Sequence, residues 1–178
     1  MEDIIKTFKI KGTEKTVEIF PSDTDSPRSW DNLGKMICFH GRYDLGDEHD
    51  FNSKDYNSWD EMKTAIVKKE KTAVILPLFL YDHSGLTLST GDFSCPWDSG
   101  QVGWAFINKK TMKENGYSKK KAIQIIQMEV KEYDYYLKGD FYDVVIEQYN
   151  KQKEQVDYDI CGGYFGIECA EQGLKEDI

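Results

Sequence analysis

The first half of the chain alternates apolar and polar residues in short runs, a pattern that predicts β-strands more than helices. Phe8 and Ile10 alternate with polar neighbours, and Val17 and Ile19 repeat the pattern after Lys11-Gly12-Thr13. Two such runs joined by a glycine-containing turn are typical of a β-hairpin. We therefore expect the chain to open with a hairpin.

Two segments instead carry the three-to-four-residue apolar period of an amphipathic helix. The shorter one, 58–70, begins with Ser58 and Glu61 at the spacing of a capping box. The longer one, 118–137, starts at a serine that can cap the helix and ends before Gly139, which can terminate it. Its apolar stripe consists of Ile123, Ile126, Val130, Tyr133 and Leu137. This stripe predicts a long helix laid on a sheet.

The remaining apolar runs predict further strands, at 35–40, 72–81, 86–89, 101–107, 141–149 and 155–160. Pro77 interrupts one of these runs, so we expect a bulge or an irregular stretch there. The order of elements indicates a single α+β domain over residues 1–178, with a mostly antiparallel sheet, one long helix and one short helix.

Composition narrows the classes of protein that this chain can represent. Its 178 residues include 32 Asp and Glu against 23 Lys and Arg, a formal net charge of -9. Such an excess of negative charge repels nucleic-acid phosphate, so direct nucleic-acid binding through a broad basic face is not expected. Because no apolar run is long enough to cross a bilayer and no signal peptide is visible, we expect a cytoplasmic protein without membrane contact.

The charge is unevenly distributed along the sequence. Residues 21–60 and 132–178 are acidic, whereas 61–131 is rich in lysine. Lys119 to Lys121 fall in the first turn of the long predicted helix, where the helix dipole disfavours positive charge. Something other than helix stability therefore favours these lysines. The acidic segments represent either an ordinary solvated surface or an imitation of nucleic-acid phosphate.

Cysteine spacing and the absence of catalytic motifs argue against an enzyme. The four cysteines, Cys38, Cys95, Cys161 and Cys169, show no CxxC spacing and are expected to be free thiols in a reducing cytoplasm. Ser99 lacks the glycine two positions earlier that a nucleophile elbow needs, and no phosphate-binding loop is present. We therefore expect a protein that acts by binding.

Asp and His residues concentrate in a few loops and point to a structural metal ion, zinc or another divalent cation. The candidate ligands are His40, Asp82, His83 and Asp98. Cys38 and Cys95 would complete a zinc site with the two histidines, whereas Asp44 or Asp47 would complete an oxygen-rich site. The alternative is that these side chains hold loops by satisfying backbone donors.

The aromatic residues near the end of the long predicted helix admit two interpretations. Tyr133 belongs to the apolar stripe and is expected in the core. Tyr135 lies off the stripe, so it is the better candidate for a partner-binding surface, where tyrosine is enriched.

Four longer motifs stand out in the loops and at strand ends. They are Ser26-Pro27-Arg28-Ser29-Trp30-Asp31-Asn32-Leu33-Gly34, Cys38-Phe39-His40-Gly41-Arg42-Tyr43-Asp44-Leu45-Gly46-Asp47, Tyr81-Asp82-His83-Ser84-Gly85 and Trp97-Asp98-Ser99-Gly100-Gln101-Val102-Gly103. Together with Cys161-Gly162-Gly163-Tyr164, they resemble a family of small proteins encoded by phages and mobile elements of Gram-positive bacteria. The likeness extends from about Ser26 to Gly166.

Proteins associated with this family include type II-A anti-CRISPR proteins, which inhibit Cas9, and at least one such inhibitor is a metalloprotein. The resemblance implies a protein that binds Cas9, or Cas9 with its guide RNA, in the cytoplasm of a bacterial host and blocks target-DNA loading or cleavage. An acidic protein suits the positively charged channels of such a nuclease. Under this hypothesis Asp134, Asp140 and Asp143 contact the partner.

Two further functions stay open at this point. A metal-dependent hydrolase of a nucleotide or similar small molecule would centre on Asp82, His83 and Asp98. An antirestriction protein that mimics DNA would differ from a Cas9 inhibitor in the nuclease that it targets.

Overall fold

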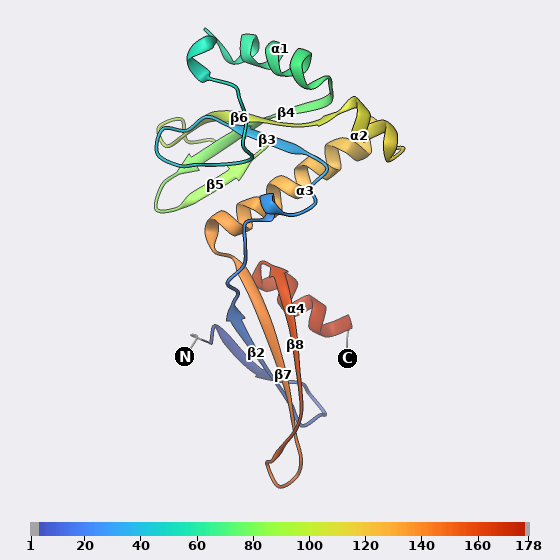
Figure 1. Cartoon of the computed structure of the whole chain (residues 1–178). Coiled ribbons are helices and arrows are strands. Elements are labelled where there is room, and N and C mark those ends of the chain that lie inside the picture. Colours follow the sequence, from blue (N-terminus) through green and yellow to red (C-terminus); the bar gives the residue numbers. More distant parts are fainter. Residues whose placement is uncertain (1–3, 177–178) are drawn as a thin grey trace. The chain divides into compact units, whose positions relative to one another are not determined.

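The computed structural model describes residues 4–176, which form eight β-strands, four α-helices and two short 3-10 helices (Figure 1). Contacts between residues divide the chain into two compact units. Unit 1 contains the residues up to Asp25 and those from Gly139 onward, and unit 2 is Ser26–Lys138. The expectation of a single domain stays a prediction, and each unit is described by itself.

Unit 2 is built on a four-stranded antiparallel sheet with the strand order β3-β6-β4-β5. Helix α1 (Trp59–Glu70) covers one face of this sheet, and helix α3 (Lys119–Lys138) covers the other (Figure 1). The remaining elements of the unit are η1 (Pro27–Ser29), β3 (Lys35–Cys38), η2 (Ser53–Asp55), β4 (Thr72–Asp82), β5 (Leu86–Ser89), β6 (Ser99–Asn108) and the six-residue helix α2 (Lys109–Glu114).

Residues 102–107 of the central strand β6 are buried on both faces, which explains why no polar side chain interrupts this part of the strand. Trp104 and Phe106 pack on the α1 side with Met62 and Ile66. Val102, Ala105 and Ile107 belong to the larger core on the α3 side. Successive residues of a strand point to opposite faces, so a strand between two helix layers has no polar face.

The two helices predicted from the apolar period are confirmed within one residue of their expected ends. The Ser58 hydroxyl accepts from the Glu61 N–H at 3.2 Å, as a capping box requires. The Glu61 carboxylate does not reach back to Ser58 but accepts from the N–H of Asn57 at 2.8 Å. In α3, Ile126, Val130 and Tyr133 are buried, as the stripe predicted.

Strand β4 contains Pro77 without a bulge at that residue. Pro77 pairs directly with Trp104, and the register shifts fall between Thr72 and Val74 and between Leu78 and Phe79. Strand β5 pairs only with Phe79–Asp82, so the first part of β4 is an edge where a proline N atom can face away from the ladder. The predicted irregularity therefore lies beside Pro77.

Unit 1 contains a second antiparallel sheet, with the order β1-β2-β7-β8. Its strands are β1 (Lys6–Lys9), β2 (Lys15–Pro21), β7 (Phe141–Tyr149) and β8 (Gln155–Phe165), and helix α4 (Ile167–Glu176) follows (Figure 1). Val17, Ile19 and Val144 are fully buried together with Ala170 of α4. The opening hairpin is confirmed, and the predicted strands 141–149 and 155–160 pair with each other as a second hairpin.

The α+β class with antiparallel sheets is confirmed, although the strands form two sheets and not one. Two helices, α2 and α4, were missed. Helix α2 has only six residues, which is too short to show an apolar period. Helix α4 follows a stretch that contains Gly162, Gly163 and Gly166, and no element was predicted there. No helix of the described residues is long and apolar enough to span a membrane.

Candidate functional site

A buried charged cluster holds the first loop of unit 2 against α3. The guanidinium of Arg28 donates to Asp47 through Nε at 2.9 Å and Nη2 at 2.7 Å, and Nη1 lies 3.5 Å from Glu129 Oε2. The Arg28 side chain is only 6% exposed. Nη2 also donates to the Gly34 carbonyl at 2.8 Å, so two carboxylates and a carbonyl surround this cation.

The two carboxylates of this cluster also serve as backbone acceptors. Glu129 accepts from the N–H groups of Leu33, at 2.8 Å, and Gly34, at 3.0 Å. Asp47 accepts from the N–H of Met36 at 2.7 Å. A side chain at Gly34 would bring its Cβ within 2.7 Å of Glu129 Oε2, so any larger residue here would force the Glu129 carboxylate to move. Burial is the main cause that raises the pKa of Glu129.

Sequence reasoning missed this cluster, although α3 carries a signal for it. Glu129 lies three residues after Ile126 and four before Tyr133, so the helical period puts a carboxylate beside the buried stripe. A charge at a buried position needs a charged or hydrogen-bonding partner. The identity of that partner, Arg28, could not be found by spacing because about a hundred residues separate the two.

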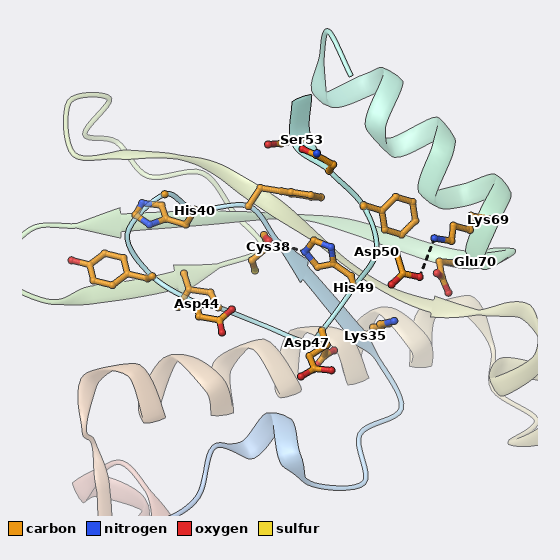
Figure 2. A pocket seen from close by; sticks show the side chains of 17 residues that line it. Lys35, Cys38, His40, Asp44, Asp47, His49, Asp50, Ser53, Lys69 and Glu70 are labelled. Atoms are coloured by element: carbon orange, nitrogen blue, oxygen red, sulfur yellow. Dashed lines mark hydrogen bonds and ion pairs between the residues drawn. The ribbon is translucent and has the colours of Figure 1, made fainter. Parts of the chain in front are cut away.

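The loop over residues 39–53 lies between β3 and α1, and its side chains line a pocket of about 1070 Å³ (Figure 2). Five carboxylates face two lysines in this lining: Asp44, Asp47, Glu48, Asp50 and Glu70 against Lys35 and Lys69. One of the lysines, Lys69, is already engaged, since its ammonium lies 3.5 Å from Asp50 and 4.5 Å from the centre of the Phe51 ring. The pocket therefore favours cationic groups over anionic ones.

Cys38 and His49 line this pocket, and contacts within the protein hold both residues in place (Figure 2). A ring nitrogen of His49, Nε2, lies 3.0 Å from the Cys38 carbonyl oxygen, and the ring packs against Phe39 and Phe51. Burial and the nearby carboxylate of Asp47 raise the pKa of the Cys38 thiol to about 12. At neutral pH this thiol is protonated, so it is neither a nucleophile nor a ready metal ligand.

The predicted metal ligands lie near one another at the other end of the loop. His40, Asp82 and Asp98 line a second pocket of about 380 Å³, and His83 Nδ1 lies 3.4 Å from Asp98 Oδ2. Asp82 is paired with Arg42, and its backbone N–H donates to the Asp98 carbonyl at 2.8 Å. The Cys95 thiol lies 3.7 Å from Asp98.

These residues do not converge on a common point. Among residues 4–176, no three His, Cys, Asp or Glu side chains are grouped so that they could hold a metal ion. Asp82 faces a cation already supplied by Arg42, and Nδ1 of His40 accepts from the Arg42 N–H at 3.3 Å. The structural metal ion stays a prediction, and the contacts of these side chains are those of groups that hold loops.

The predicted partner-binding residues are also engaged within the protein. Asp134 is 14% exposed and accepts from the N–H of Leu88 at 2.8 Å and from Lys138 at 2.6 Å. Lys131 lies over the ring of Tyr135, 5.5 Å from its centre. In unit 1, Asp140 accepts from the Tyr142 hydroxyl at 3.4 Å, and Asp143 accepts from the Gly163 N–H at 3.1 Å. These four side chains support local structure, and their role toward a partner stays a prediction.

The open surface of unit 1 lies on one side of its sheet. Direct pairing puts Glu18, Val145 and Ile160 on the same face, and Thr16, Glu147 and Tyr158 beside them. The residues packed with α4 lie on the opposite face, which carries Val17 and Ile146. We call the first of these two faces the open face and define it by Glu18, Val145, Glu147, Tyr158 and Ile160; Val156, which is unpaired at a register shift of β8, adjoins it.

Strand β8 exposes a row of large apolar side chains on the surface of unit 1. Val156 is 56% exposed, Tyr158 52% and Ile160 55%, and the three occur at every second residue. Strand β8 is also the last strand of its sheet, so one of its backbone edges has no strand partner among the described residues. An exposed apolar row bordered by carboxylates is typical of a protein-binding surface.

Comparisons with protein-family models, with curated proteins and with solved structures find no match to this chain.

Proposed function

We propose that this protein acts by stoichiometric binding and that its partner is a CRISPR nuclease of the Cas9 type, bound through the open face of unit 1. The observation that carries the proposal is the apolar row of β8 set in a strongly acidic unit. Unit 1 contains 7 Lys against 16 Asp and Glu, whereas unit 2 contains 16 Lys and Arg against 16 Asp and Glu. The whole net charge of -9 therefore belongs to unit 1.

The chemistry of the open face fits a basic partner. Val156, Tyr158 and Ile160 offer apolar area that binding would bury, and tyrosine is enriched among the residues that dominate interface energies. The carboxylates of Glu18 and Glu147 border the row. Negative charge steers such a face toward a positive surface and excludes acidic partners.

Cas9 is the partner that the sequence motifs favour. The nuclease holds its guide and target heteroduplex in a positively charged channel, which an acidic protein can occupy or border. A protein bound there would block target-DNA loading or the later docking step that permits cleavage. The apolar row would anchor the complex, and the charge of unit 1 would accelerate its formation.

A matched pair of variants tests this surface. Ile160 and Met128 are 55% and 58% exposed, but only Ile160 lies on the open face, because Met128 belongs to α3 of unit 2. We expect Ile160→Ser to weaken binding to immobilised guide-loaded Cas9 by more than tenfold and Met128→Ser to change it by less than twofold, because only the first removes an interface anchor. Equal affinities of the two variants and the unaltered protein would exclude the open face.

The antirestriction alternative shares the charge argument and is tested in the same experiment. Type I restriction enzymes immobilised beside Cas9 offer a second basic DNA-binding surface. Binding to the restriction enzyme and not to Cas9 would assign the open face to that class of nuclease. Binding to Cas9 alone supports the proposal.

A further inference from the structure

The structure gathers most of the lysines of unit 2 at one end of its sheet. Segments 68–71 and 109–121 contain nine lysines and two glutamates, whereas the rest of unit 2 contains seven Lys and Arg against fourteen Asp and Glu. The neutral unit is thus strongly dipolar, with a net charge of +7 at one end and -7 over the remainder. This end of unit 2 therefore attracts nucleic-acid phosphate, although the protein as a whole is negatively charged.

Three elements bring these lysines together where β4 begins and β6 ends (Figure 1). Thr72 pairs with Asn108, and the N–H of Lys109 donates to the carbonyl of Lys71 at 3.0 Å, which joins the end of α1 to the start of α2. The N–H of Tyr117 donates to the Met112 carbonyl and turns the chain from α2 into α3. We call the resulting surface the lysine end and define it by Lys68, Lys71, Lys109, Lys110, Lys113, Lys119, Lys120 and Lys121.

Most of this positive charge is not neutralised within the protein. All eight side chains are exposed. Lys110 forms a surface pair with Glu114 at 3.8 Å, and no other lysine of this group has an ion pair among the described residues. Like charges gathered in this way repel one another. Binding of an anion to this surface would reduce that repulsion.

At two places the lysines oppose local stability. Lys119 to Lys121 occupy the first turn of α3, where the helix dipole is positive and favours acidic residues. Lys71 adopts the left-handed conformation, with φ 51° and ψ 47°, at a helix end where glycine is preferred. The positions of Lys119 to Lys121 are not explained by the stability of their helix, whereas at Lys71 the helix dipole favours a cation and only the backbone conformation opposes a side chain.

We propose that the lysine end binds the sugar–phosphate backbone of nucleic acid, without reading its sequence. Lysines act as point charges that follow phosphates, and phosphate contacts position a protein without specifying bases. Of the exposed large apolar side chains in the described residues, none lies in 68–71 or 109–121, so the surface lacks the anchors that a membrane or a protein interface needs. This proposal does not depend on the identity of the protein partner.

The test is fluorescence anisotropy of the full chain with labelled oligonucleotides of 20 residues, as single-stranded RNA, single-stranded DNA and duplex DNA. The variant carries Lys119→Glu, Lys120→Glu and Lys121→Glu. Its matched control carries Lys9→Glu, Lys11→Glu and Lys151→Glu, three exposed lysines of unit 1 whose replacement changes the net charge equally. Glutamate suits the dipole at the start of α3, so the first variant is expected to keep its thermal midpoint.

We expect the unaltered protein to bind at 50 mM salt, with an affinity that falls as salt rises. The α3 variant should bind at least tenfold more weakly, and the slope of log K against log salt should be smaller by roughly 2 to 3, about 0.7 to 0.9 for each lost phosphate contact. The control should stay within twofold. Three results would overturn the proposal. They are equal losses of affinity in both variants, no binding to any oligonucleotide, and binding to phosphatidylserine vesicles by a protein that binds none of the oligonucleotides. The three oligonucleotides show which nucleic acid is preferred.

Discussion

The two units of this protein bury their sheets to different extents and carry different charge. In unit 2 a helix covers each face of the sheet, and fourteen buried residues form the core on the α3 side alone. In unit 1 α4 covers one face and contributes Ala170 to a cluster of four fully buried residues, and the other face is open. Unit 1 nevertheless carries the whole net charge of -9. Most of the stabilising core and the proposed partner surface therefore lie in different units.

The largest expected effect is a difference in stability between variants of two Arg–Asp pairs of unit 2. Arg28 is 6% exposed and Arg42 is 70% exposed, although each pairs with one aspartate. We expect Arg28→Ala to lower the free energy of unfolding by about 3–5 kcal/mol, because it leaves Asp47 and Glu129 buried without their cation. Arg42→Ala should cost less than about 1 kcal/mol, since the pair is solvated. Urea denaturation of both variants measures the difference, and equal costs would show that the buried cluster does not stabilise unit 2.

A second pair of variants tests how closely the backbone must approach the same cluster. Gly34→Ala would place a methyl group 2.7 Å from Glu129 Oε2, whereas the same change at Gly100 meets no atom within 4 Å. We expect the first to cost about 1–3 kcal/mol of unfolding free energy and the second less than about 0.5 kcal/mol. Thermal unfolding followed by circular dichroism gives both values. A cost at Gly100 as large as that at Gly34 would remove the steric explanation.

The pH dependence of stability should contain a contribution from Glu129. Burial raises its folded pKa above the ordinary value of 4.5, so the folded state binds this proton more tightly than the unfolded state does. Stability from this group is therefore present below pH 4.5 and decreases as pH rises through the raised pKa. We expect the decline between pH 4.5 and 7 to be smaller in Glu129→Gln than in the unaltered protein. Parallel curves of unfolding free energy against pH would contradict this assignment.

The smallest effect concerns thiol reactivity and does not change stability. Cys38 of unit 2 is buried with a pKa of about 12, whereas Cys169 of unit 1 is exposed. A rise from 9 to 12 lowers the thiolate fraction about a thousandfold at a given pH. Mass spectrometry after brief treatment with iodoacetamide at pH 8 should find Cys169 modified and Cys38 unmodified. Modification of Cys38 at the rate of Cys169 would show that unit 2 opens at this strand.

Regular elements could be predicted from the sequence because their periods are local. The stripe of 118–137 and the cap at Ser58 define helices through residues three or four apart. The residues that pack against these elements are distant from them in the sequence. Alternation predicted a strand at 155–160, but only its pairing with β7 and the position of α4 show that Tyr158 and Ile160 lie on the open face.

The candidate site illustrates the same limit. Clustering of Asp and His in the sequence placed His40, Asp82, His83 and Asp98 near one another, and two pockets do form around this loop. The sequence could not show that Arg42 reaches Asp82, because loop geometry decides which cation fills an acidic position. The lysines of the lysine end were visible as a composition bias, whereas their convergence depends on the pairing of Thr72 with Asn108.

The most direct test of the proposed function is target-DNA binding by guide-loaded Cas9 in the presence of increasing amounts of this protein. We predict that binding or cleavage of the target is lost at a one-to-one ratio of protein to nuclease, with a stable complex visible by size-exclusion chromatography. Ile160→Ser should restore activity, and Met128→Ser should inhibit like the unaltered protein. Full cleavage at a large excess of folded protein, with no complex for several Cas9 orthologues, would contradict the account.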